Sequence, residues 1–163
     1  MNVQTAVRIS ALVFTAWIAR GEISTVAQTL DGTWMATITR INPPPGTPPT
    51  FTSLHTYLPG GGVIETTSTG RTNRSVGIGD WVRTGERQFT NTIYMMRYDP
   101  GEVFAGVTRI IRNIRLAENR KEFLGVSVSE LYDTDGKLIR TLRATEVGKR
   151  VELGEIPDDP GRP

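Results

Sequence analysis

Four residues are our candidates for acid–base chemistry. His55 is the only histidine, and because imidazole titrates near neutral pH it is a candidate general base or ligand contact. Tyr57, Glu65 and Glu130 could supply the remaining acid or base groups. Together they would equip a cofactor-free isomerase, cyclase or lyase. His55 also fits a second interpretation, a partly exposed strand residue with no chemical role.

Other short motifs do not indicate a metal, a cofactor or a covalent intermediate. One histidine and no cysteines fall short of the three or four nitrogen or sulfur ligands of most zinc sites. Asp133-x-Asp135-Gly136 starts like a calcium loop but has no glutamate at the twelfth position, so we interpret it as a hairpin turn. No helix is expected after Gly77-Ile78-Gly79, which excludes a dinucleotide fingerprint. The sequence therefore predicts no metal and no cofactor.

Positive charge is too sparse to indicate a nucleic-acid partner. The chain has a formal net charge of +2, far from the basic excess of proteins that bind phosphate backbones. One local cluster contains Arg109, Arg112, Arg115, Arg120 and Lys121. Strand alternation places Arg112 on the face opposite Arg109 and Arg115. We interpret this cluster as solvated barrel surface rather than a binding patch.

The elements that must position these residues are β-strands. Downstream of residue 30, runs rich in β-branched residues alternate with glycine, proline and aspartate turns. The predicted strands are 34–41, 51–58, 63–68, 80–84, 88–98, 103–116, 123–132 and 137–145. A proline-rich connection covers residues 42–49, and a glycine-rich loop is predicted over 69–79. Short connections predict an all-β fold, a single antiparallel up-and-down barrel of about eight strands over residues 28–151.

Alternation along the predicted strands gathers polar and aromatic side chains on shared faces. If Trp34 points inward, so do Ala36, Ile38 and Arg40, and Phe51, Ser53, His55 and Tyr57 share a face of the next strand. An apolar interior with a few polar groups is typical of a ligand site. The predicted pocket wall contains Trp34, His55, Tyr57, Trp81, Asn91 and Tyr94. Alternatively these faces lie outside, since a shift of one residue inverts a strand.

The N-terminal segment has the layout of a secretory signal peptide. Residues 1–8 are polar with one positive charge, residues 9–19 are apolar, and small polar residues follow as far as Ala27. The apolar run is too short to span a bilayer as a helix. We therefore expect residues 1–27 to be a cleaved signal-like helix and the protein to be exported. The alternative is an N-terminal helix packed on the barrel. Residues 152–163 are acidic and proline-rich, and we expect a loose tail.

Gly32-Thr33-Trp34, followed by an antiparallel meander, resembles the start of the lipocalin and wider calycin superfamily. The layout is most similar to small exported bacterial calycin-like proteins without an assigned function. The resemblance implies that Trp34 closes one end of the barrel. It also implies that an arginine from the last strand region, Arg143 or Arg150, packs across this tryptophan. Fold alone does not determine an activity.

Three functions follow from these expectations. The first is non-covalent binding of a small, largely apolar molecule in the barrel, with residues 42–49 and 69–79 as lids. The second is the cofactor-free isomerase, cyclase or lyase. The third is a structural or interaction protein with a fully packed interior. A small molecule and a second copy of the chain are the expected partners, without nucleic acid or a stable membrane span.

Overall fold

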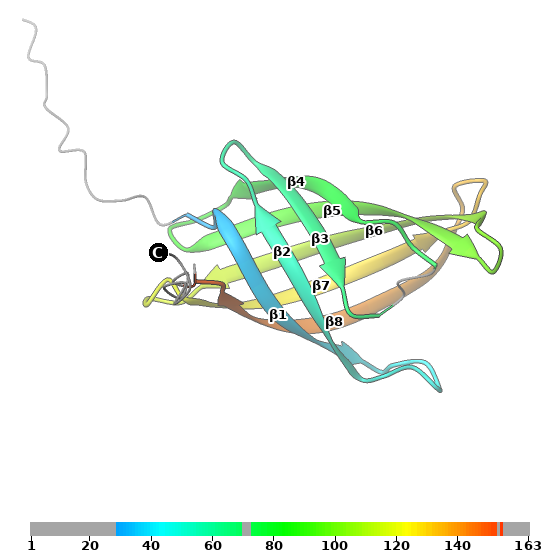
Figure 1. The fold of residues 1–163 in the computed structure, drawn as a ribbon, viewed down its shortest axis with the longest axis horizontal. Coiled ribbons are helices and arrows are strands. Elements are labelled where there is room, and N and C mark those ends of the chain that lie inside the picture. Colours follow the sequence, from blue (N-terminus) through cyan, green and yellow to red (C-terminus); the bar gives the residue numbers. More distant parts are fainter. Residues whose placement is uncertain (1–28, 70–72, 153, 155–163) are drawn as a thin grey trace, which may run out of the picture.

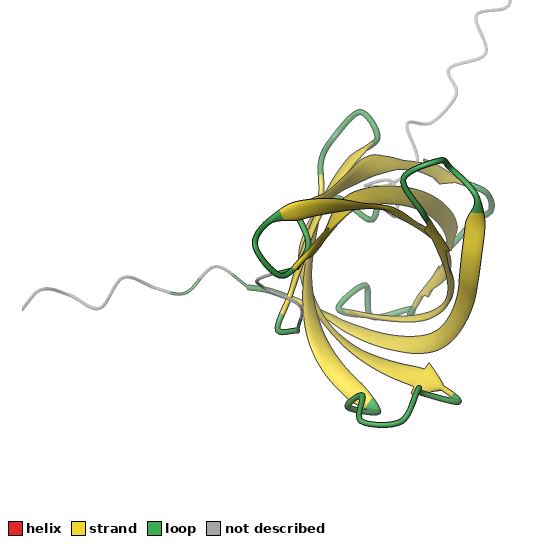
Figure 2. Ribbon diagram, turned by 90° about the vertical axis from the view of Figure 1, so that its right-hand side faces the viewer, coloured by secondary structure: helices red, strands yellow, loops and turns green. Residues whose placement is uncertain are grey.

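The computed structural model describes residues 29–69, 73–152 and 154. It contains eight antiparallel strands, along which side chains alternate between the two faces of the sheet. Each strand pairs with the next, and the last pairs with the first, so the sheet closes into a barrel (Figures 1 and 2). The strands are β1 Gly32–Ile41, β2 Thr50–Tyr57, β3 Gly62–Thr67, β4 Gly77–Arg83, β5 Gln88–Asp99, β6 Val103–Leu116, β7 Glu122–Tyr132 and β8 Leu138–Arg150. The predicted all-β, up-and-down barrel is therefore confirmed.

The two ends of the barrel carry different connections. The turns β2–β3, β4–β5 and β6–β7 lie at one end, near the described chain termini. The proline-rich connection 42–49, the β3–β4 connection and the β5–β6 and β7–β8 hairpins lie at the other end (Figure 1). We name these the closed end and the open end, because side chains fill only the first.

Aromatic side chains pack the closed end around Trp34, which is fully buried. The indole N–H donates to the carbonyl of Leu30 at 2.8 Å, and the Phe123 ring centroid lies 5.2 Å from that of Trp34. The Arg150 guanidinium lies 4.2 Å from the indole centroid and donates to the carbonyl of Asp31. Of the two predicted arginines, Arg150 therefore packs across Trp34, a favourable cation–π contact.

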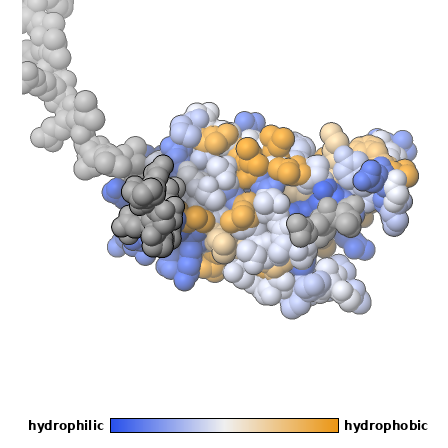
Figure 3. All heavy atoms as spheres, viewed as in Figure 1, coloured by the Kyte–Doolittle hydropathy of each residue, from blue (hydrophilic) through white to orange (hydrophobic). Residues whose placement is uncertain are grey.

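The inward faces of the first two strands are those expected from the sequence. Trp34, Ala36 and Ile38 are buried in β1, and Ser53, His55 and Tyr57 are buried in β2. The outward positions of β1 to β4 carry many aliphatic side chains. Figure 3 shows apolar residues gathered over these strands, and Met35, Leu54, Ile64, Ile78 and Val82 are among the exposed ones. Apolar residues on both faces explain why face assignment from sequence alone is uncertain.

Two strand boundaries differ from the prediction by more than two residues. Residues 77–79 belong to β4 instead of a loop, because their glycines allow close contact between strands. A Cβ on Gly79 would lie 1.9 Å from the Thr92 carbonyl oxygen of β5, closer than any side chain permits. β8 continues to Arg150, five residues beyond the predicted end. Glu146 and Gly148 face inward there and interrupt the apolar pattern on which the prediction depended.

The described residues contain no helix long and apolar enough to cross a membrane. The predicted leader, residues 1–27, lies outside the described residues. So does most of the predicted tail, of which only Glu152 and Gly154 are described.

Gly148 makes room for the aromatic packing at the closed end. A Cβ at this position would lie 2.1 Å from Cε1 of Phe123, so we expect Gly148→Ala to lower the free energy of unfolding by about 1–3 kcal/mol through overpacking. The matched control is Gly125→Ala, also inward-facing, where the nearest heavy atom is 3.4 Å away. The control should change stability by less than about 1 kcal/mol. Urea unfolding followed by tryptophan fluorescence measures both, and equal stabilities would contradict this account of the packing.

Candidate functional site

A buried ion triad crosses the middle of the barrel. Arg112 of β6 extends across the interior, where its Nε donates to Glu146 Oε1 of β8 at 2.8 Å. Its Nη2 donates to Glu65 Oε2 of β3 at 2.6 Å. The three residues are at most 3% exposed. Because the guanidinium is planar, these contacts link three separate strands in one fixed geometry.

Mutual attraction favours the charged forms of Arg112 and Glu65 despite their burial. Burial by itself lowers the pKa of Arg112, but Glu146 and Glu65 more than offset this and raise it. Burial would raise the pKa of Glu65, yet the charge and hydrogen bond of Arg112, together with the charges of His55 and Arg74, outweigh that effect and hold the pKa below its usual range. Two carboxylates facing one guanidinium leave the triad with one net negative charge.

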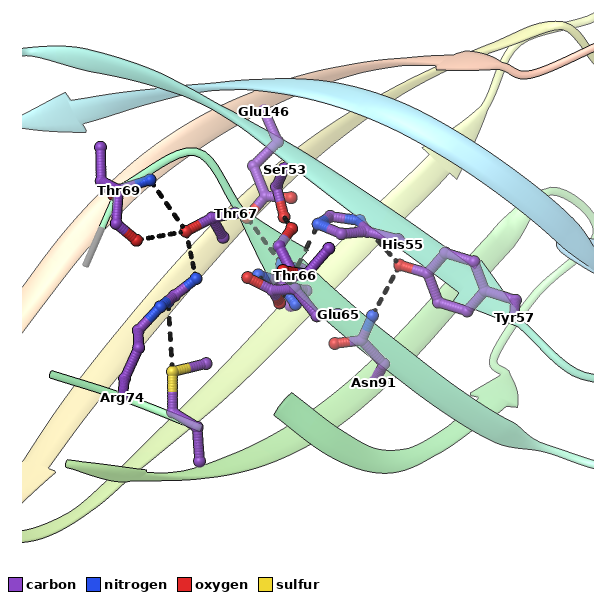
Figure 4. A network of polar contacts seen from close by, with 12 residues as sticks. Ser53, His55, Tyr57, Glu65, Thr66, Thr67, Thr69, Arg74, Asn91 and Glu146 are labelled. Carbon is purple, nitrogen blue, oxygen red and sulfur yellow. Dashed lines mark hydrogen bonds and ion pairs between the residues drawn. The ribbon is translucent and has the colours of Figure 1, made fainter. Parts of the chain in front are cut away.

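A chain of neutral polar groups lies beside the triad, towards the closed end (Figure 4). The Asn91 amide donates to the Tyr57 hydroxyl at 2.8 Å, and that hydroxyl lies 3.5 Å from His55 Nδ1. His55 Nε2 lies 3.9 Å from Glu65 Oε2. Burial, followed by the positive charge of Arg112, lowers the pKa of His55 to about 4. Burial also raises the pKa of Tyr57, so both side chains are neutral at pH 7.

A cavity of about 310 Å³ occupies the open half of the barrel. Glu65, Arg112 and Glu146 form its floor, and apolar side chains from most of the strands form much of its wall. Serine and threonine hydroxyls and several arginine side chains contribute polar groups to that wall. The apolar residues that line the cavity are Ile38, Phe51, Met95, Ile110, Leu131, Leu142 and Ala144.

The triad also contains two buried polar atoms without a partner among the described residues. Arg112 Nη1 and Glu146 Oε2 have no hydrogen-bond partner within the part of the chain that the structure describes. An unpaired buried donor or acceptor costs roughly 1–3 kcal/mol, so such groups usually contact water or a ligand. The triad therefore keeps one donor and one acceptor unsatisfied by the described residues and out of reach of solvent.

Most predicted site residues lie in the packed half of the barrel. Trp34, His55, Tyr57 and Asn91 are buried, and Trp81 is half-buried against the same core. None of these five residues borders the cavity. The interior is therefore divided, with the sequence-predicted aromatic cluster on one side of the triad and the cavity on the other.

Two predicted residues lie on the outer face. Tyr94 is 51% exposed, so its prediction as part of the pocket wall is wrong. It alternates with Asn91 and Ile93, which point inward. Glu130 forms an outer ion pair with Arg109 at 2.6 Å and accepts a hydrogen bond from the Tyr132 hydroxyl. Among the sequence candidates for acid–base chemistry, only Glu65 borders the cavity.

Sequence reasoning missed Arg112 and Glu146. Arg112 was interpreted as solvated surface, but it shares a strand face with the buried residues Ile110 and Ile114. The alternation of inward and outward residues along this strand indicates that Arg112 is buried. The prediction gave more weight to the rarity of charged residues in protein interiors. Glu146 lies beyond the predicted end of the last strand, so no face was assigned to it. Among residues 29–69, 73–152 and 154, no three histidine, aspartate or glutamate side chains gather as a metal site.

Burial of neutral His55 makes stability depend on pH. The pKa is about 4 in the folded protein and about 6.5 when unfolded, so the unfolded state binds a proton first as pH falls. We expect the free energy of unfolding to drop by about 2 kcal/mol between pH 7 and pH 5. Urea titrations at both pH values should show that His55→Gln loses most of this dependence. An equal drop in both proteins would mean that another group is responsible.

Removing the central cation should be far more damaging than removing an outer one. Arg112→Met leaves two buried carboxylates without a counter-ion, and we expect a loss of about 3–5 kcal/mol in the free energy of unfolding. Arg109→Met, on the outer face of the same strand, is the matched control and should change stability much less. Chemical denaturation measures both variants. Similar losses would show that the triad does not dominate the interior.

Comparison with known proteins adds no family assignment. No protein-family model matches the chain, and no curated protein has a significantly similar sequence.

Proposed function

We propose that this protein binds a small, largely apolar molecule non-covalently in the open half of its barrel. The observation that carries the proposal is the cavity of about 310 Å³ above the ion triad. Its volume equals roughly ten water molecules in the liquid, which is more than the usual packing defect. Ligand pockets begin at about this size.

The composition of the cavity wall supports an apolar guest. Aliphatic side chains and Phe51 face one another across the space, while hydroxyl groups come from Thr108, Ser127 and Ser129. Covering such a wall with an apolar molecule is favourable because it removes apolar surface from water. A few polar groups among apolar ones give orientation and specificity.

The positions of the acid–base groups favour binding over the alternative isomerase, cyclase or lyase. His55 and Tyr57 are neutral at pH 7 and lie behind the floor of the cavity. Glu65 reaches the cavity but is held as a carboxylate by Arg112, which makes it a weak base. A hollow half-barrel also favours binding over the alternative of a fully packed structural barrel.

Two further features support a place among exported calycin-like barrels. The eight strands close as an antiparallel meander, and an arginine of the last strand covers the tryptophan of the first. Export rests on the layout of residues 1–27. The proline-rich connection 42–49 lies at the open end, and Asn73 and Arg74 of the β3–β4 connection border the cavity, so these segments are the proposed lids.

An uncharged fluorescent probe, N-phenyl-1-naphthylamine, tests the proposed pocket. We expect its emission to rise saturably on titration with the protein, since it fluoresces more strongly in apolar surroundings. Ala144→Phe places a ring in the cavity and should weaken binding at least tenfold. Thr145→Phe, the next residue and outward-facing, is the matched control and should leave the affinity within twofold. Equal affinity in both variants would place the probe outside the barrel and contradict the proposed function.

A further inference from the structure

Charge is distributed unevenly along the cavity. Five arginines line it against three carboxylates, namely Arg40, Arg74, Arg97, Arg112 and Arg143 against Glu65, Asp99 and Glu146. Arg112, Glu65 and Glu146 bind one another at the floor. Four arginines and Asp99 therefore remain around the wall and mouth, so the floor is negative and the mouth is positive.

Three of the mouth arginines are held in place by neutral groups. Arg40 donates to the Pro48 carbonyl and lies 4.2 Å from the centroid of Phe51. Arg74 donates to the Thr67 hydroxyl and to the sulfur of Met95 (Figure 4). Arg97 Nη2 donates to the carbonyls of Ala105 at 2.9 Å and Tyr132 at 2.6 Å. Such contacts fix the guanidinium groups without neutralising them.

These three arginines have no carboxylate within salt-bridge distance among the described residues. All three also line the cavity. An acid oxygen is the strongest hydrogen-bond partner of a guanidinium group, because both carry charge. The mouth therefore offers positioned guanidinium groups, none of them in a salt bridge among the described residues, to a negatively charged group.

We propose that the ligand is a small organic acid whose acid group is bound at the mouth by Arg40, Arg74 and Arg97. This inference rests on the proposed function and specifies the chemistry of its ligand. The uncharged apolar part of the molecule extends inward between Ile38, Met95 and Ile110 towards the floor.

Electrostatics fixes this orientation. An acid group at the floor would meet the two carboxylates of the triad, whose single guanidinium already binds both of them. In a site shielded from water, that repulsion is much stronger than in solution. An uncharged inner end of the ligand, in contrast, meets no such repulsion. The acid group therefore belongs at the mouth.

Two fluorescent probes that differ by one acid group test this inference. 8-Anilinonaphthalene-1-sulfonate is N-phenyl-1-naphthylamine with an added sulfonate, so their affinities can be compared directly in the intact protein. We expect the sulfonate probe to bind at least tenfold more tightly, as an acid group bonded to arginine adds a charge-assisted contact. High salt should remove part of this advantage.

Single arginine variants locate the acid group. Arg74→Gln and Arg97→Gln should each weaken sulfonate binding about tenfold while leaving the uncharged probe within twofold. Arg40→Gln, at the end of β1, gives a third and structurally milder variant. Arg109→Gln on the outer face is the control and should leave both probes unchanged.

The outcomes separate the two proposals. If the uncharged probe binds and the sulfonate gives no advantage, or if the mouth variants weaken both probes equally, the acid-binding inference is overturned and the pocket remains. If sulfonate binding survives in Ala144→Phe, the acid is held outside the cavity, which also overturns it. If neither probe binds, the proposed function fails and this inference fails with it.

Discussion

The ion triad of Arg112, Glu65 and Glu146 is the constraint on which the rest of the interior depends. Burying three charges is expensive, and the cost is offset only while the two hydrogen bonds at 2.8 and 2.6 Å keep their geometry. Because these residues come from β6, β3 and β8, their contacts restrict how the walls of the barrel can move relative to one another. Apolar side chains packed at the same place would not impose this geometry, because apolar contacts are not directional. The triad therefore acts as a rigid partition between the two halves of the interior.

The partition separates packing from binding. Below it, Trp34, Phe123 and Tyr57 fill the closed end, and Gly148 provides the space that the Phe123 ring occupies. Above it, apolar and arginine side chains line the wall and leave a cavity between them. Stability can therefore be concentrated at the closed end, while the open half keeps a space that a fully packed core would have lost. The chemistry of the cavity can be considered separately from the packing that supports it.

The strand pattern and the turns were predictable because glycine, proline and β-branched residues determine them locally. The inward faces of β1 and β2 followed from Trp34 in the same way. The face of β5 did not, since Asn91 and Tyr94 were both assigned to the pocket although alternation allows only one of them inside. Arg112 and Glu146 were missed for a different reason. A charge is stable inside only with its partner, and no local pattern shows that residues 34 positions apart will pair.

The same partition explains why the mouth and the floor carry opposite charge. Glu65 and Glu146 hold Arg112 in place and leave the floor negative by one charge. The arginines beyond them interact with carbonyl, hydroxyl and thioether groups, whose dipoles position a guanidinium but leave its charge uncompensated. A molecule that enters therefore crosses a field that draws its negative end outwards and its neutral end inwards. The residues that stabilise the barrel thus also determine which way a ligand can lie within it.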